Sequence, residues 1–304
     1  MIMIKQIQFL IFTLFIAFKI ASAQQIAITF DDAPMQDGEY FTGKERAGLL
    51  TEKLHESKVT AAFFCITNQF DSAGIERIKL YEDAGHLIAN HTHTHSWINN
   101  IGVANYIEDI ARADSILKDF RNFMKWFRYP YLDEGKTIEE RDAIRNALQE
   151  MNYINGYVTV DNYDWYINSM LQKALKENKQ VDFNKLEKFY IDHIWQSIIF
   201  YDNIAKRTLG RSPAHVLLLH ENDLAALFID KLIRHIKSQG WEIISPAEAY
   251  KDEIVSIIPD VLFNGQGRVA AIAYEMGIKP NELVQHSEDT DYLEEQALTL
   301  DIFK

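Results

Sequence analysis

Short apolar runs alternate along the chain with longer segments that carry apolar residues at helical spacing. The runs are rich in β-branched and aromatic residues and cover residues 26–30, 59–66, 86–89, 126–129, 156–160, 215–219 and 241–244. The segments with apolar positions three and four residues apart cover residues 45–57, 75–84, 103–120, 138–152 and 224–239. Strands that alternate with helices of this length predict crossover connections and a parallel sheet covered on both faces. About seven such units are typical of a (β/α) barrel or of an open, doubly wound sheet.

Two stretches interrupt this alternation. Residues 166–211 lack a clear strand pattern and predict two helices, a helical insertion in the α/β fold. After Pro246 the pattern changes to one turn, two short helices and an acidic segment, at residues 264–267, 272–276, 281–285 and 287–300. We therefore expect a main domain over residues 24–250 and a C-terminal helical appendage over 251–304 that packs on it.

The N-terminus has the pattern of a secretory signal. Lys5 lies in a short polar region, residues 7–20 are almost wholly apolar, and Ala21-Ser22-Ala23 has the small-x-small form of a cleavage site. Lys19 interrupts the apolar run, which is short for a transmembrane span, and an uncleaved anchor is the alternative. We predict a signal peptide over residues 1–23 that is cleaved near Ala23. The protein would then be exported, periplasmic or secreted, with no stable insertion in the membrane.

Composition narrows the classes of partner. The chain has 304 residues, with 44 Asp and Glu against 31 Lys and Arg, a net charge of −13. This charge repels phosphate and argues against nucleic-acid binding. Cys65 is the one cysteine, so the sequence has no cysteine-rich zinc framework, and a metal would be held by histidines and carboxylates. The sequence indicates no oligomeric state.

Polar residues gather where the predicted strands end. The clusters are Asp31-Asp32, His91-Thr-His-Thr-His95, Arg128-Tyr-Pro-Tyr131, Asp161-Asn-Tyr-Asp-Trp165 and His220-Glu-Asn-Asp223. In parallel α/β folds, ligands bind at the carboxyl ends of the strands. These clusters are therefore expected to converge on one site.

The residue types in these clusters point to metal chemistry. His91 and His95 are four residues apart, so on a helical turn both rings face the same way, as a divalent metal requires. Adjacent carboxylates repel each other and need a cation or a donor nearby, although Asp31 and Asp32 would also serve as a helix N-cap pair. Two histidines and one carboxylate describe a catalytic zinc site or a non-haem iron site. The second carboxylate could then take a proton from an attacking water.

Five ordered motifs resemble those of the polysaccharide deacetylases, the NodB-homology group of carbohydrate esterase family 4. They are Thr29-Phe-Asp-Asp32, His91-Thr-x-x-His95, Arg128-x-Pro-Tyr131, Asp161-x-x-Asp-Trp165 and Leu218-x-His220. The resemblance implies a distorted (β/α) barrel of about seven parallel strands. It also implies a metal-dependent hydrolase that removes acetyl groups from N-acetylated sugars, acting on a linear amide.

Carried over residue by residue, the resemblance gives each motif a role. Asp32, His91 and His95 would bind the metal, with zinc expected and cobalt, iron or nickel accepted by the same ligand types. Asp31 would be the catalytic base, held by Arg128, and His220 would be the general acid, tuned by Asp164. Four further motif residues would contact the substrate: Tyr131, Trp165, Leu218 and Asp161. Trp165 and Leu218 would form the walls of the slot that receives the acetyl methyl group. Asp161 could instead have a structural role.

Some positions depart from the family pattern. Tyr129 lies inside the third motif, and His220 is followed by Glu221-Asn222-Asp223. These departures bear on the substrate, which we expect to be an acetylated glycan containing N-acetylglucosamine, such as peptidoglycan, chitin oligomers or a surface polysaccharide. The alternatives are an O-acetyl ester hydrolase on a xylan-type polysaccharide and a glycan-binding protein with weak catalysis.

Overall fold

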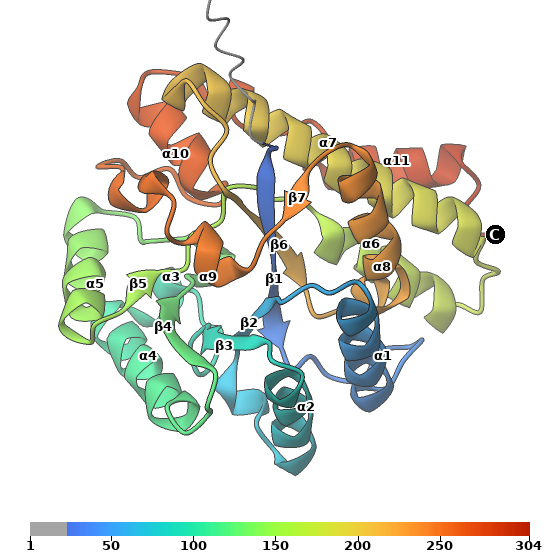
Figure 1. Ribbon diagram of the computed structural model, residues 1–304, viewed down its shortest axis with the longest axis horizontal. Helices are drawn as coiled ribbons and strands as arrows, with labels where there is room; N and C mark the ends of the chain where they lie inside the picture. The colour runs from blue at the N-terminus through green and yellow to red at the C-terminus, as the bar shows by residue number, and fades with distance from the viewer. Residues whose placement is uncertain (1–22) are drawn as a thin grey trace, which may run out of the picture.

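Parallel strands form a curled sheet that is enclosed by helices (Figure 1). The computed structural model describes residues 23–304, so the predicted signal peptide lies outside the described residues except for Ala23. The strands are β1 (Gln25–Ala33), β2 (Ala62–Cys65), β3 (Leu87–Asn90), β4 (Phe123–Phe127), β5 (Ile154–Asn155), β6 (His215–His220) and β7 (Glu242–Ile243). Their order is β5-β4-β3-β2-β1-β6, with β7 paired to the start of β1, and every pair is parallel.

The chain after β5 closes the curled sheet toward β6. Gly156 donates its N–H to the Phe127 carbonyl of β4 (2.6 Å), and Val160 pairs in parallel with β6. The prediction of a continuous strand over residues 156–160 is therefore wrong, because the regular strand is Ile154–Asn155. Residues 156–160 pass from β4 to β6, so they cannot form a regular ladder of hydrogen bonds with either strand. The outcome is the expected distorted (β/α) barrel.

The predicted crossover helices are present with small shifts at their ends. The helices are α1 (Gly43–Glu56), α2 (Ser72–Asp83), α3 (Ile98–Ile101), α4 (Val103–Leu117), α5 (Ile138–Glu150), α6 (Asp164–Lys176), α7 (Phe183–Leu209), α8 (Asp223–Ser238), α9 (Pro246–Ala249), α10 (Gly267–Glu275) and α11 (Thr290–Thr299). Single 3₁₀ turns cover Thr67–Gln69, Pro130–Leu132, Glu253–Ser256 and Pro280–Glu282. Local sequence sets several boundaries: a Thr42–Glu45 capping box begins α1, and Gly210, in the left-handed conformation, ends α7.

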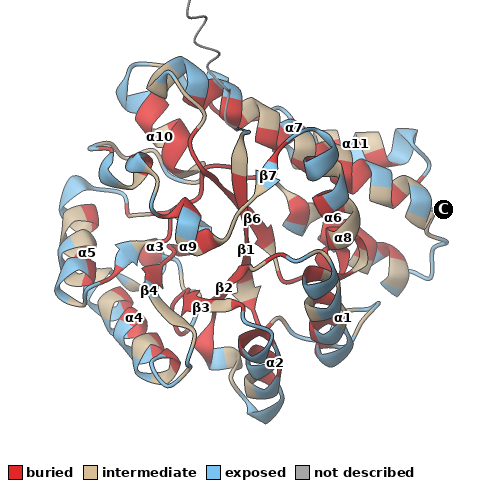
Figure 2. Ribbon diagram, viewed as in Figure 1, coloured by how far each residue is buried: buried red, intermediate tan, exposed pale blue. Residues whose placement is uncertain are grey.

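The core lies on both sides of the strands. The β2 residues are all buried, and five consecutive residues of β6 are buried as well. Figure 2 shows that the enclosing helices turn buried faces inward and exposed faces outward. The near-continuous apolar runs of the sequence are explained by this two-sided cover.

The insertion and the C-terminal tail pack on each other. The insertion contains α6 and α7, as predicted, and α7 contacts α8 and the tail helix α10. At the chain end, Lys304 exchanges two backbone hydrogen bonds with Gln180 (2.9 and 2.8 Å). Residues 281–285, predicted as a helix, form only the turn Pro280–Glu282. The domain boundary at residue 250 stays a prediction.

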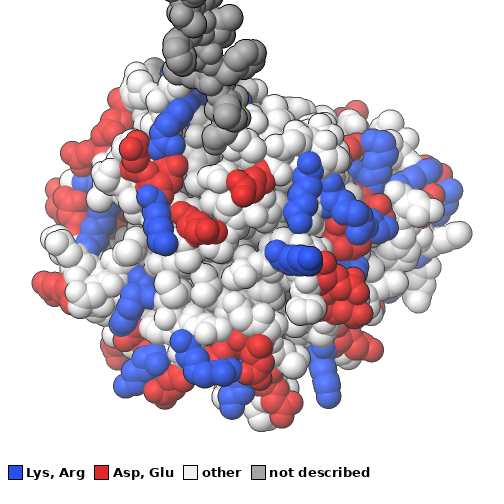
Figure 3. Space-filling view, in the orientation of Figure 1, with Lys and Arg blue, Asp and Glu red and all other residues white. Residues whose placement is uncertain are grey.

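Charge is mixed on one face of the molecule (Figure 3). Lys and Arg lie among Asp and Glu on the face drawn in Figure 3, around a central region with few charges. On this face the excess of acidic residues therefore does not gather into one patch. Within residues 23–304, no helix has both the length and the apolar character needed to cross a membrane.

Candidate active site

Four strands deliver the polar motifs to one edge of the barrel. Asp31 and Asp32 lie near the C-terminal end of β1. His220 is the last residue of β6 and pairs with Asp31 in the register of the two strands. His91 follows β3, and Arg128 follows β4. Because all these strands are parallel, their carboxyl ends meet at the same edge, and the motif side chains come within contact distance there.

Three candidate metal ligands lie together at this edge. The ligand atoms of Asp32, His91 and His95 are all within 4.8 Å of one another. Oδ1 of Asp32 lies 3.6 Å from Nε2 of His91 and 3.3 Å from Nε2 of His95. This oxygen is buried and accepts no hydrogen bond from the residues that the structure describes. A buried carboxylate oxygen without a partner is costly, and a cation would satisfy it, so these residues fit a divalent metal.

His91 is held in the form that binds metals. Its Nδ1 donates to the carbonyl oxygen of Arg128 (2.8 Å), which leaves Nε2 as an acceptor facing Asp32. Burial, with the charge of His95 as a smaller cause, lowers the pKa of His91 to about 3. A neutral imidazole with a free Nε2 is the form that coordinates a cation.

The two histidines do not lie on a helical turn, which corrects the prediction from their spacing. The residues after β3 form a loop in which Thr92 and His95 have positive φ angles of 71° and 55°. Oγ1 of Thr92 accepts a hydrogen bond from the backbone N–H of His95 (2.9 Å). The ring centroids of His91 and His95 are 4.9 Å apart. Left-handed residues turn the chain back within a few positions, so the imidazoles converge without a helix.

Asp31 lies beside this cluster and is held by an arginine. Nη1 of Arg128 donates to Oδ1 of Asp31 (2.6 Å), while Oδ2 of Asp31 lies 3.7 Å from Nε2 of His91. Arg128 is fully buried. Burial raises the pKa of Asp31, although the charges of Arg128 and His220 oppose the rise. One carboxylate oxygen is thus fixed, and the other faces the candidate metal ligands.

His220 is paired with Asp164, whose carboxylate favours the protonated imidazole. Nδ1 of the His220 ring lies 2.7 Å from Oδ1 of Asp164, and the backbone N–H of His220 donates to Oδ2 of the same carboxylate (3.0 Å). Burial disfavours the charged imidazole, but the carboxylate of Asp164, with smaller contributions from Asp32 and Asp31, outweighs it and raises the pKa of His220 to about 10. Of the two aspartates in this motif, Asp164 and not Asp161 makes the contact.

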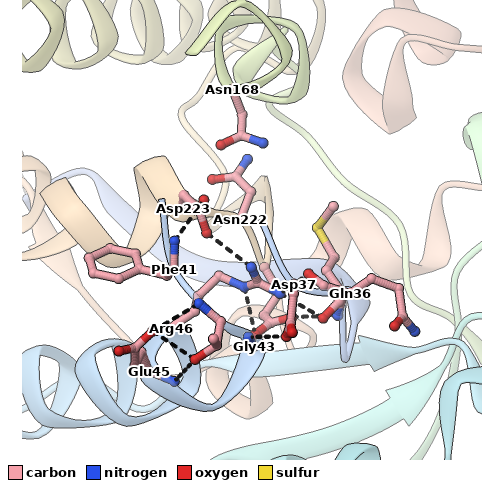
Figure 4. Close-up of polar contacts among 12 residues, drawn as sticks. Gln36, Asp37, Phe41, Gly43, Glu45, Arg46, Asn168, Asn222 and Asp223 are labelled. Atoms are coloured by element: carbon pink, nitrogen blue, oxygen red, sulfur yellow. Dashed lines mark hydrogen bonds and ion pairs between the residues drawn. The ribbon is translucent and has the colours of Figure 1, made fainter. Parts of the chain in front are cut away.

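The buried side chain of Arg46 joins the loop after β1 to the residues that follow β6 (Figure 4). Nη1 of Arg46 donates to Oδ1 of Asp223 (2.9 Å), and its Nε lies 3.3 Å from Oε1 of Glu221. The other oxygen of Glu221 accepts the Met35 N–H (2.6 Å). Sequence reasoning missed Arg46, and the only signal was the unusual Glu221-Asn222-Asp223 after His220.

The remaining motif residues are not equally exposed. Tyr131 and Trp165 are 58% and 43% exposed, whereas Leu218 and Asp161 are buried. Burial and the nearby Glu288 raise the pKa of Asp161 well above its ordinary value. Of these four residues, the two aromatic ones are therefore the ones that face solvent.

Comparisons with known proteins give relatives in sequence and in fold. Residues 19–154 match the sequence profile of the family described as polysaccharide deacetylase. A peptidoglycan-N-acetylglucosamine deacetylase of Bacillus cereus is 28% identical over 228 residues, which are 73% of this chain and 66% of that protein. The match thus spans just under two thirds of the length of this curated relative.

Solved structures share the fold. The chitin deacetylase of the fungal pathogen Colletotrichum lindemuthianum aligns with a TM-score of 0.54 and 19% identity, over 75% of this chain and 88% of that chain. A family 4 carbohydrate esterase of Streptomyces lividans, in complex with acetate, aligns with a TM-score of 0.50 and 21% identity, over 74% of this chain and 95% of that chain. At these identities the likeness concerns the barrel itself.

Proposed function

We propose that the chain is a polysaccharide deacetylase, a metal-dependent hydrolase that removes acetyl groups from N-acetylated sugars. Residues 19–154 match the profile of that family, and a curated deacetylase is 28% identical. One observation carries the proposal. A buried carboxylate held by an arginine, an imidazole held by an aspartate and a three-ligand cluster meet at neighbouring strand ends. Amide hydrolysis needs these parts, because an amide is a poor electrophile with a poor leaving group.

The ligand cluster provides for the electrophile and the nucleophile. A divalent cation held by Asp32, His91 and His95 would polarise the acetyl carbonyl and lower the pKa of a water molecule. The donor set of two imidazoles and one carboxylate suits zinc, and cobalt, iron or nickel bind the same ligand types. Measuring the metal content of the purified protein identifies which of these metals it binds.

Asp31 is the base in this mechanism. Its raised pKa makes it a stronger proton acceptor than an exposed carboxylate, and Arg128 fixes the orientation of its carboxyl group. Oδ2, which Arg128 leaves free, takes the proton from the water that attacks the acetyl carbon.

His220 is the acid. Asp164 accepts a hydrogen bond from Nδ1, so the mobile proton of the imidazolium is on Nε2. With a pKa of about 10, His220 is protonated at neutral pH and can donate to the departing amine nitrogen. The free amine and acetate are the products.

We further propose that the substrate is a glycan with N-acetylglucosamine units, met after export. The support is that the curated relative is a peptidoglycan deacetylase and that the solved fungal enzyme is a chitin deacetylase. The signal-like N-terminus agrees with such an extracellular substrate.

The test separates amide from ester hydrolysis. Acetate release is measured from N-acetylglucosamine oligomers, peptidoglycan and acetylated xylan, each with and without a chelator. We expect chelator-sensitive release from the N-acetylated substrates. Release from xylan alone would assign the protein to the ester hydrolases, and metal binding without release from any substrate would favour a glycan-binding role.

A further inference from the structure

We propose that Trp97, which lies outside the deacetylase motifs, extends the expected substrate contact of Tyr131 into a sugar-binding subsite beside the metal-ligand cluster. The subsite would take the pyranose ring next to the one that loses its acetyl group. This inference rests on the proposed deacetylase function and names the part of the glycan that the protein holds. We refer to the two side chains together as the Trp97–Tyr131 ledge.

The Trp97–Tyr131 ledge begins beside the candidate metal ligand His95 and extends from it toward solvent. The ring of His95 lies edge-on to that of Tyr131 with centroids 4.8 Å apart, and the Tyr131 and Trp97 centroids are 6.3 Å apart. Tyr131 is 58% exposed and Trp97 is 38% exposed. Two large aromatic side chains left in water side by side indicate a contact surface more than a core. A pyranose ring presents C–H groups on its faces and hydroxyls at its edges, which suits such rings.

A buried carboxylate holds the indole of Trp97 in place. Oδ2 of Asp133 accepts hydrogen bonds from Nε1 of Trp97 and from Nδ2 of Asn99 (3.0 Å). Asp133 is only 7% exposed. Water would satisfy an indole N–H at no structural cost, so the internal acceptor serves to fix the ring rather than to rescue the N–H. A side chain that is already fixed loses less freedom when a ligand stacks on it.

The C-terminal tail braces the same carboxylate. Nδ2 of Asn264 donates to Oδ1 of Asp133 (2.8 Å) and to the carbonyl of Gly135 (2.9 Å). The turn at residues 264–267 thereby reaches from the tail to the ledge, although the deacetylase motifs end well before it. Fixing the ledge gives the tail a specific role at the site.

A cationic donor completes the subsite. Nζ of Lys136 lies 5.3 Å from the centre of the Trp97 ring. An ammonium group at this place can donate hydrogen bonds to sugar hydroxyls. The ledge therefore combines aromatic faces with polar groups at the rim, as ligand sites that orient a polar molecule do.

The experiment compares substrates of different length. Acetate release from N-acetylglucosamine pentamer and dimer is measured for the wild type, Trp97→Ala and Trp97→Phe. Loss of one stacking ring should raise KM for the pentamer roughly tenfold, raise KM for the dimer less, and leave metal content unchanged. Trp97→Phe keeps a ring and should recover most of the affinity. Leu80→Ala removes an equally exposed apolar side chain (41%) from α2 and is the matched control.

Binding is measured separately from turnover. Calorimetric titration of the pentamer into Asp31→Asn protein, with and without Trp97→Ala, reports affinity without hydrolysis. If Trp97→Ala does not fold, Tyr131→Ala removes the other ring without touching the hydrogen bonds of Asp133.

The outcomes distinguish the subsite from the function. Unchanged KM and affinity in Trp97→Ala, or an equal loss in Leu80→Ala, would overturn the subsite while deacetylation stands. A wild-type protein that neither binds nor deacetylates any N-acetylglucosamine oligomer would overturn the proposed function and the subsite with it.

Discussion

Asp164→Asn should shift the alkaline limit of activity, because Asp164 is what keeps His220 charged. The pKa of His220, about 10, lies well above the ordinary 6.5 even though burial alone would lower it. Since one pKa unit corresponds to about 1.4 kcal/mol, this preference for the charged imidazole is worth about 5 kcal/mol. The protonated form is the acid, so activity falls as the pH rises through the pKa of His220.

In Asp164→Asn the neutral amide no longer offsets burial. The pKa of His220 should then fall, because only the more distant carboxylates of Asp32 and Asp31 still oppose burial, and most of the imidazole should be neutral at pH 8. We expect kcat at that pH to fall by at least about tenfold, with partial recovery toward lower pH. Asp164→Glu, which keeps the charge, should retain more of the alkaline activity.

The assay is the pH profile of kcat for acetate release, together with an NMR titration of the His220 ring. The NMR titration does not depend on turnover, so a damaged active site cannot mimic the shift. An alkaline limit that stays in place in Asp164→Asn, with an unchanged His220 titration, would refute this reasoning.

Three other variants test the remaining parts of the site. Asp31→Asn should keep its metal and lower kcat by at least about a hundredfold, and a fully active variant would exclude Asp31 as the base. Arg128→Lys should lower kcat without changing metal content, since lysine cannot reproduce the planar set of donors around Asp31; an unchanged kcat would separate Arg128 from the base. Arg46→Met leaves two buried carboxylates without their cation and should cost about 3–5 kcal/mol in urea unfolding; an unchanged midpoint would contradict that account.

The sequence pattern was sufficient for a parallel α/β sheet and for the meeting of the motifs, and the resemblance to the deacetylases selected the barrel over an open sheet. Each strand is a short apolar run, and each motif follows its strand directly, so the parallel topology alone brings Asp31 and His220 to one edge. These features are local, and local patterns survive in the sequence.

The errors occurred where contacts or backbone conformation decide the outcome. The four-residue spacing of His91 and His95 suits a helix, but left-handed residues at Thr92 and His95 produce a loop. The apolar run at residues 156–160 is buried like a strand, but it passes from β4 to β6 and pairs regularly with neither.

Contacts between distant segments were out of reach. Arg46 meets Glu221 across 175 positions, and Asn264 meets Asp133 across 131. Each of these residues has an ordinary setting in the sequence, an amphipathic helix or a turn. Only the folded chain shows that they support the strand ends and the exposed ring of Trp97.

Acetate release from an N-acetylglucosamine pentamer is the most direct test of metal-dependent deacetylation. The purified protein is assayed as isolated, after treatment with a chelator, and after zinc is added back. We predict release by the isolated protein, its loss on chelation and its recovery with zinc. Release that persists at full rate in protein shown to contain no metal would contradict the account.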